Sequence, residues 1–244
     1  IAPSVFRIAR TLLARVESDV TGDLLVDELT VPIPPARIDQ ARAAAGVLGA
    51  QIAGKLPFVP GARALSDSPV ELVLNNTWRP TLAVTGAAGL PLMENAGNVL
   101  LPRLELKLSF RLPPSADADA AAAAVKKRLE ADPPYGVRVR FDVGSSLPGW
   151  DAPPVAPWLE AAMREASRAT FGRDAMYLGT GGSIPFIGML GERFPGTQFL
   201  VTGVLGPHSN AHGPNEFLHL DCAEKLTVCV AKVIADHHGR PPAQ

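Results

Sequence analysis

The segment LELKLSFRL, residues 104–112, constrains the fold more than any other part of the chain. Polar and apolar side chains alternate along it, and the polar positions are Glu105, Lys107, Ser109 and Arg111. Strict alternation is typical of a strand with one buried and one solvated face, as antiparallel sheets have. We therefore expect an antiparallel sheet with one face packed against the protein core.

The residues on either side of this strand predict the rest of the layer. PTLAVTG, residues 80–86, reads as a short strand, and GVRVRFDV, residues 136–143, alternates as a further one. Between the strands at 104–112 and 136–143 we expect a helix capped by Ser115. Asp117 and Asp119 would lie in its first turn, where the helix dipole favours negative charge. The predicted fold class is a two-layer, ferredoxin-like α+β unit with helices on one face of the sheet.

The chain opens directly on an amphipathic helix, residues 1–16, with no start signal before it. A transit peptide is an alternative reading, but three arginines over sixteen residues are ordinary for the solvent face of a core helix. We therefore expect the beginning of the protein to be missing. Further on, a helix is predicted from about Pro35, and PVELVLNN, residues 69–76, alternates weakly.

A proline-rich stretch, residues 144–158, marks a boundary between two predicted domains, 1–143 and 144–244. Beyond it we expect a helix ended by a glycine over 158–172, a continuous apolar strand over 197–205 and a closing helix over 221–238. The closing helix has Asp221 and Glu224 at capping-box spacing. Its expected buried stripe is Cys222, Leu226, Cys229, Val230 and Ile234. This order suggests an incomplete α/β segment.

Composition excludes several classes of function. With 23 basic against 24 acidic residues the formal net charge is −1, which argues against binding to nucleic acid or to a charged membrane surface. No apolar run approaches the roughly 20 residues of a membrane span. Cys222 and Cys229 lie seven residues apart in a predicted helix, beyond disulfide reach. A cytoplasmic protein is expected.

Three weak motifs could carry chemistry. His208 and His212 lie in GPHSNAHGPNE, whose glycines and prolines predict a loop, so a zinc-binding HExxH helix is excluded. GTGGSIPF, which contains Gly182 and Ser183, is a glycine turn that could admit a ligand or be purely structural. A serine hydrolase built on Ser183 and His212 lacks an orienting carboxylate.

The third motif is Arg111, on the solvated face of the strongest strand, with Asn98 upstream in AGNVLLP. A guanidinium suits a carboxylate bidentately, although an arginine on such a face is more often only solvated. The last two histidines, His237 and His238, lie at the end of the closing helix and are interpreted as surface residues that suit its dipole.

Taken together, NTWRPTLAVTG, AGNVLLPRLELKLSFRLPP, GGSIPF and SNAHGPNEFL resemble, in this order, the later part of the carnosinase, aminoacylase and glutamate carboxypeptidase family of di-zinc metallopeptidases. The resemblance covers essentially the whole chain. It implies that 1–143 is the dimerising lid domain and that 144–244 is the last part of the zinc-binding catalytic domain.

The resemblance also implies roles for individual residues. His212 matches the C-terminal zinc ligand, and Asn98 and Arg111 match lid residues that reach the substrate, the arginine binding its carboxylate. Gly182 and Ser183 match a turn that lines the substrate pocket. In such enzymes two zinc ions share a water that a glutamate deprotonates for attack on the amide carbonyl.

Several features of that family are not found in this sequence: its HxD segment, its bridging aspartate, its Glu-Glu pair and its lid histidine. Gly179 and Thr180 replace an Arg/Glu pair before GGSIP. Because a zinc ion needs about three protein ligands, one credible ligand cannot hold two ions. We therefore predict a fragment of a cytoplasmic, homodimeric, zinc-dependent exopeptidase for dipeptides or N-acyl amino acids, inactive without the missing N-terminal half of its catalytic domain.

Two alternatives remain open at this stage. A non-catalytic dimerisation or small-molecule-binding module would never have had the metal-binding half. A related amidohydrolase acting on N-carbamoyl or N-succinyl substrates would share the site and differ in its substrate.

Overall fold

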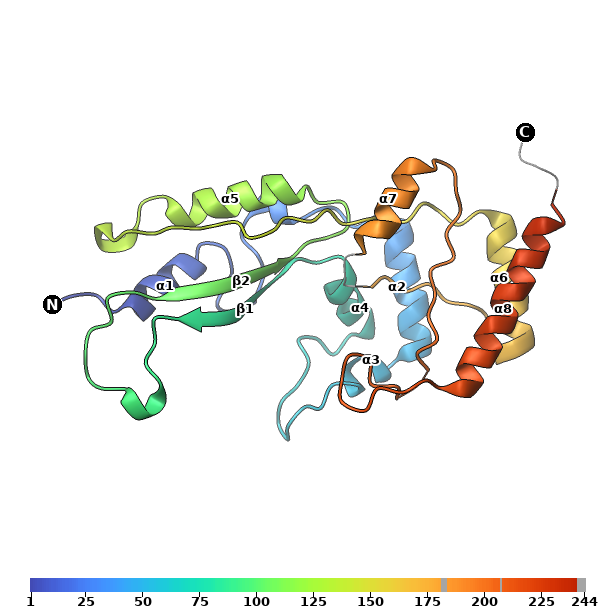
Figure 1. The fold of residues 1–244 in the computed structure, drawn as a ribbon, viewed down its shortest axis with the longest axis horizontal. Helices are drawn as coiled ribbons and strands as arrows, with labels where there is room; N and C mark the ends of the chain where they lie inside the picture. Colours follow the sequence, from blue (N-terminus) through green and yellow to red (C-terminus); the bar gives the residue numbers. More distant parts are fainter. Residues whose placement is uncertain (181–183, 207, 241–244) are drawn as a thin grey trace. The chain divides into compact units, whose positions relative to one another are not determined.

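The computed structural model describes residues 1–180, 184–206 and 208–240 (Figure 1). It divides into two compact units, Ile1–Asp151 with Leu178–Leu190 and Ala152–Tyr177 with Gly191–Gln244. Three short 3-10 turns, η1 (Asp27–Leu29), η2 (Met93–Asn95) and η3 (Pro134–Gly136), lie in the first unit. No helix in these described ranges is long and apolar enough to cross a membrane.

The first helix, α1 (Val5–Leu13), confirms the amphipathic helix expected at the start of the chain. It does have a start signal, contrary to the sequence interpretation. The hydroxyl of Ser4 accepts a hydrogen bond from the Phe6 N–H at 3.3 Å, and Ser4 has the extended backbone of an N-cap. The helix therefore begins at its own cap.

Three helices follow in the first unit: α2 (Pro35–Leu48), α3 (Gln51–Gly54) and α4 (Pro69–Thr77). The start of α2 confirms the prediction from Pro35. The weak alternation of 69–76 was misleading, because this segment is helical and Ser68 caps it by accepting from the Glu71 N–H. A buried cluster joins α2 to α4 and comprises Ala41, Ala45, Val73, Leu74 and Trp78.

The predicted strands at 80–86 and 104–112 are confirmed as β1 (Thr81–Ala88) and β2 (Glu105–Arg111), which pair antiparallel. Thr81 lies opposite Arg111, and the register shifts between Val84 and Gly86. Such an irregularity adds local twist to the ribbon. The two strands form a hairpin whose connection spans 89–104.

The helix after the hairpin is α5 (Ala118–Glu130), and its cap is Asp117 rather than the predicted Ser115. The Asp117 carboxylate accepts from the N–H groups of Asp119 and Ala120, each at 3.0 Å, a geometry that only the residue directly before the first turn can reach. At the other end of α5, the guanidinium of Arg15 donates to the carbonyls of Arg128, Ala131 and Asp132. These bonds satisfy the end of α5, where carbonyls lack intrahelical partners.

The main core of the first unit lies between α1, α5 and the hairpin. Its buried residues are Val16, Val26, Leu29, Ala121, Val125 and Leu129. Leu82 of β1 and Leu108 and Phe110 of β2 pack against them. Leu12 of α1 also packs against this cluster, so α1 and α5 lie on the same face of the hairpin, as the sequence predicts for a two-layer unit.

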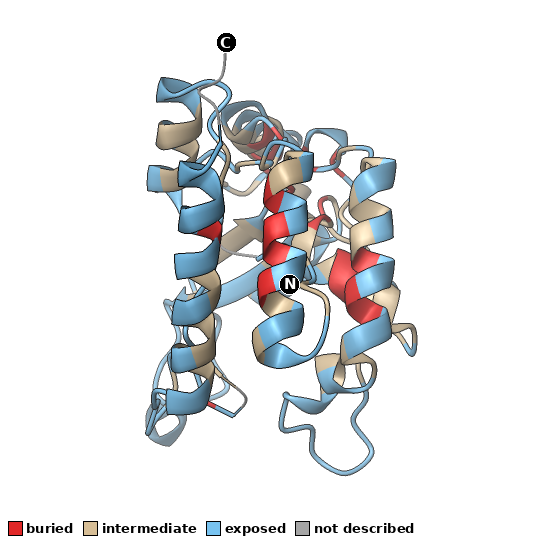
Figure 2. Ribbon diagram, turned by 90° about the vertical axis from the view of Figure 1, so that its right-hand side faces the viewer, coloured by how far each residue is buried: buried red, intermediate tan, exposed pale blue. Residues whose placement is uncertain are grey.

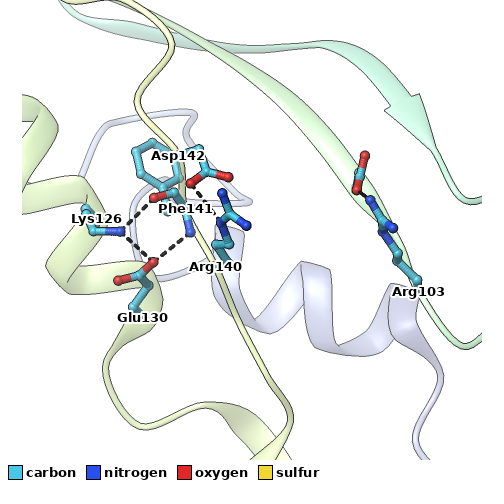
Figure 3. Close-up of polar contacts among 7 residues, drawn as sticks. Arg103, Lys126, Glu130, Arg140, Phe141 and Asp142 are labelled. Carbon is cyan, nitrogen blue, oxygen red and sulfur yellow. Dashed lines mark hydrogen bonds and ion pairs between the residues drawn. The ribbon is translucent and has the colours of Figure 1, made fainter.

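The predicted strand at 136–143 is not formed, so the described residues contain a two-stranded sheet instead of the larger ferredoxin-like sheet. The burial still alternates: Val137, Val139 and Phe141 are half-buried, and the residues between them are exposed. The Glu130 carboxylate accepts from Lys126 Nζ and from the Phe141 N–H, each at 2.7 Å (Figure 3). Lys126 Nζ also donates to the Phe141 carbonyl at 2.7 Å, so side chains of α5 bind the segment's backbone.

The second unit contains α6 (Pro157–Phe171) and α8 (Leu220–His238), while α7 (Pro185–Arg193) crosses the division between units. Gly172, with φ 72°, ends α6 as predicted. Buried residues form a stripe along α6 at helical spacing, and Figure 2 colours such residues red. They are Leu159, Ala162, Met163 and Ala166. Val233 of α8 packs against this stripe.

Two expectations for the second unit are wrong. Residues 197–205 form no strand, so an α/β layer is not found among the described residues. The cap of α8 is His219 rather than the Asp221 and Glu224 pair, because the imidazole Nδ1 accepts from the Cys222 N–H at 3.2 Å.

The side chains of α8 follow the predicted stripe in part. Ile234 is exposed, whereas Cys222, Leu226, Cys229 and Val230 are half-buried. Both cysteines are free, as expected.

The Glu130 contacts predict a dependence of stability on pH. Hydrogen bonding to Lys126, and then to the Phe141 N–H, lowers the pKa of the Glu130 carboxyl below its ordinary 4.5. A lowered folded-state pKa means that the carboxylate stabilises the fold above about pH 4.5, and that this contribution is lost as pH falls through the folded-state pKa. Glu130→Gln should therefore lower the urea midpoint at neutral pH.

The difference between Glu130→Gln and the wild type should shrink in acid, where both side chains are neutral. Urea titrations across this pH range measure it, with Glu94→Gln, an exposed glutamate of η2, as the matched control. A gap that stays constant with pH would show that the Glu130 charge does not hold the 137–143 segment.

Candidate functional site

His212 lies in a loop of the second unit, between the extended residues 197–206 and helix α8. The loop predicted from its glycines and prolines is confirmed: the described residues 208–217, which we call the histidine loop, contain turns and no helix. His212 is exposed and has φ 61°, in the left-handed region that few non-glycine residues adopt. The imidazole is therefore carried on an unusual backbone.

Two glycines fit the histidine loop to its surroundings. A Cβ at Gly213 would lie 2.7 Å from Cγ of Asn210, so a residue with a side chain there would displace the Asn210 side chain from its place in the loop. A Cβ at Gly206 would lie 2.6 Å from Cγ of His219, the residue that caps α8. Glycine therefore lets the chain pass directly beside the first turn of α8 before it enters the loop.

A glutamate that the sequence interpretation missed organises this loop. Glu216 Oε2 accepts a hydrogen bond from the backbone N–H of His212 at 2.6 Å. The only signal in the sequence is the placement of a glutamate four residues after the histidine in AHGPNE. That spacing acquires meaning only once the turn between them is known.

Arg111 and Asn98 belong to the hairpin of the first unit. Arg111 is the last residue of β2, opposite Thr81, and Asn98 lies in the connection between the strands. Both residues are exposed. Near the base of this connection Arg103 forms an ion pair with Glu105 (Figure 3). His212, in contrast, belongs to the second unit.

The predicted pocket residues Gly182 and Ser183 lie outside the described residues. Close to them in the sequence, Gly179 lies against α4, since a Cβ added at this position would lie 3.0 Å from Cγ2 of Thr77. Helix α7 begins two residues after Ser183, at Pro185.

The described residues do not fit a metal ion by themselves. Among residues 1–180, 184–206 and 208–240, no group of three or more His, Cys, Asp or Glu side chains is placed to hold one. Three protein ligands are the usual minimum for a zinc site. His212 is thus a candidate for a single ligand within this chain.

The sequence is similar to a dipeptidase. No family model matches the chain. A cysteinylglycine-S-conjugate dipeptidase of Corynebacterium striatum is 29% identical to it over 167 residues, which is 66% of this chain and 36% of that protein.

Solved structures show the same fold. The di-peptidase Dug1p of Saccharomyces cerevisiae matches 99% of this chain with a TM-score of 0.74 at 18% identity. Human carnosine dipeptidase 1 matches 97% with a TM-score of 0.68 at 19% identity. The M20 family metallo-carboxypeptidase Sso-CP2 of Sulfolobus solfataricus matches 96% with a TM-score of 0.65 at 16% identity.

The chain is related to the M20 dipeptidases. This confirms the resemblance that the four motifs of the sequence indicate. The chain spans about half the length of the solved relatives, at 50%, 50% and 52%, and 36% of the Corynebacterium relative.

The close fit at Gly206 predicts the effect of a single methyl group. Gly206→Ala should destabilise the fold by about 1–3 kcal/mol, because the added carbon overlaps the His219 side chain. Gly203→Ala is the matched control, since no heavy atom lies within 4 Å of its added carbon. Urea unfolding followed by far-ultraviolet circular dichroism measures both. Equal midpoints for the two variants would contradict the described packing.

Proposed function

We propose that this chain is a portion of a zinc-dependent exopeptidase that hydrolyses dipeptides or N-acyl amino acids. The observation that carries the proposal is His212, exposed on an internally bonded loop in the motif AHGPNE of a chain related to M20 dipeptidases. The relatives are described as a cysteinylglycine-S-conjugate dipeptidase, a di-peptidase, a carnosine dipeptidase and a metallo-carboxypeptidase. Each of these names denotes a peptidase.

In this proposal 1–143 is the lid domain, through which the protein forms a homodimer, and 144–244 is the last part of the catalytic domain. Arg111 binds the carboxylate of the substrate, and Asn98 contacts the substrate from the same hairpin. A guanidinium supports this role because its planar fork donates two parallel hydrogen bonds to a carboxylate. Gly182 and Ser183 line the pocket.

The complete enzyme is proposed to bind two zinc ions, of which this chain supplies the ligand His212. Two zinc ions require about three protein ligands each, and one imidazole meets only a small part of that requirement. The other ligands and the general base are therefore proposed to come from polypeptide outside these residues. This chain by itself is expected to be inactive.

The proposal is tested with the complete translated open reading frame that contains these residues. Zinc-dependent hydrolysis of dipeptides is expected, lost on chelation and restored by zinc. His212→Ala should reduce kcat/KM by more than about 100-fold, because even groups that only support metal ligands contribute about 10- to 100-fold. His238→Ala, an exposed histidine in the last turn of α8, is the control and should be neutral.

An inactive full-length protein that binds no zinc would contradict the peptidase proposal. That outcome would instead favour the non-catalytic dimerisation or binding module. Activity restricted to N-carbamoyl or N-succinyl substrates would favour the related amidohydrolase.

Arg111→Ala should raise KM for substrates with a free carboxylate about 10- to 100-fold, which corresponds to a hydrogen bond to a charged group. The same variant should scarcely change KM for amidated substrates, because they lack the charge that the guanidinium binds. Lys107→Ala is the matched control, since this exposed residue lies on the same strand. Equal changes in KM for both kinds of substrate would remove the anchor role of Arg111.

A further inference from the structure

The histidine loop holds an unusual concentration of left-handed backbone. His208, Asn210, His212 and Asn215 have φ values of 63°, 53°, 61° and 59°. A left-handed conformation costs a non-glycine residue roughly 1–2 kcal/mol, and asparagine tolerates it better than histidine. At His212 the conformation therefore needs a compensating interaction.

Hydrogen bonds within the loop supply that compensation. The Asn210 side chain donates from Nδ2 to the Pro214 carbonyl at 2.7 Å, and the Gly213 N–H donates to the Asn210 carbonyl at 2.9 Å. The Phe217 N–H donates to the carbonyl of Ser209, a residue only 3% exposed, at 3.1 Å. The loop is thus closed on itself and attached to the unit through a buried residue.

Among these bonds, the bond from His212 to Glu216 is distinctive. An exposed carboxylate is ordinarily best satisfied by water, yet Glu216 Oε2 lies 2.6 Å from the His212 backbone nitrogen. A hydrogen bond from an N–H to an ionised carboxylate is stronger than one between neutral groups. It holds the amide of His212 in the direction that the left-handed conformation requires.

We propose that Glu216 is a positioning residue for His212. The backbone conformation of a residue sets the direction of its Cα–Cβ bond, so fixing φ at His212 also fixes where the imidazole can reach. Without the carboxylate, His212 relaxes towards the right-handed region, which L-residues favour, and its ring points elsewhere. The inference rests on the proposed function, in which this imidazole is a metal ligand.

The choice of variants separates positioning from general structural support. Glu216→Gln keeps an acceptor oxygen and loses the charge, so it should preserve much of the conformation of His212. Glu216→Ala removes the acceptor and should release it. Glu224→Ala is the matched control, an exposed glutamate on α8 in the same unit.

Nuclear magnetic resonance of the chain provides a readout independent of enzymatic activity. A strong cross-peak between the amide and Hα protons of His212 itself is the signature of positive φ. Glu216→Ala should abolish this signature and speed hydrogen exchange of the His212 amide about 10- to 100-fold, the worth of a hydrogen bond to a charged group. Glu216→Gln should retain the signature, and Glu224→Ala should match the wild type.

Unchanged α8 amide signals in Glu216→Ala would show that the unit remains folded, so that a change at His212 is local and supports the proposal. A His212 signature that persists in Glu216→Ala would overturn it, whatever the activity of the complete protein. In the complete protein, Glu216→Ala should lower kcat/KM, with partial rescue by Glu216→Gln. A complete protein without peptidase activity would refute the proposed function while leaving the loop measurement intact.

Discussion

Packing of helices against one face of a two-stranded hairpin is the constraint on which the first unit depends. Leu108 and Phe110 of β2 and Leu82 of β1 present the apolar face that α1 and α5 cover. A single hairpin is marginally stable in water and needs such a cover. The hairpin in turn carries Asn98 and Arg111, so the candidate substrate-binding residues are placed by an element that owes its stability to α1 and α5.

The pattern of apolar and polar residues in this sequence predicts which side chains face the core better than it predicts which groups the backbone binds. The hairpin and the helices that begin at residues 35, 118, 157 and 220 are predictable from the sequence, because their periodicity is strong. Residues 137–143 alternate in burial as expected, yet their backbone is bound by Glu130 and Lys126. A strand exists only where another strand accepts its hydrogen bonds, and alternation does not identify such a partner. The same reasoning explains why the apolar run at 197–205 forms no strand.

The candidate site was predictable in its residue types and not in its supporting contacts. A histidine in a glycine- and proline-rich loop is visible in the sequence, as is an arginine at the end of an alternating strand. The role of Glu216 depends on a turn that brings its side chain back to the amide of His212, four residues earlier. The caps of helices are equally hard to predict from the sequence. Ser115 and Asp117 are both good capping residues, and the choice between them follows from where the helix axis begins.

The extended segment 137–143 also bears on the behaviour of the protein at high concentration. Within the described residues no strand pairs with it, and an extended segment with alternating apolar residues is a template for edge-to-edge aggregation. Arg138, Arg140 and Asp142 occupy the outward positions and are exposed. Charged side chains at such positions discourage addition of a foreign strand, since their water shells would have to be stripped away. The charged residues of this segment thus protect it against aggregation through added strands.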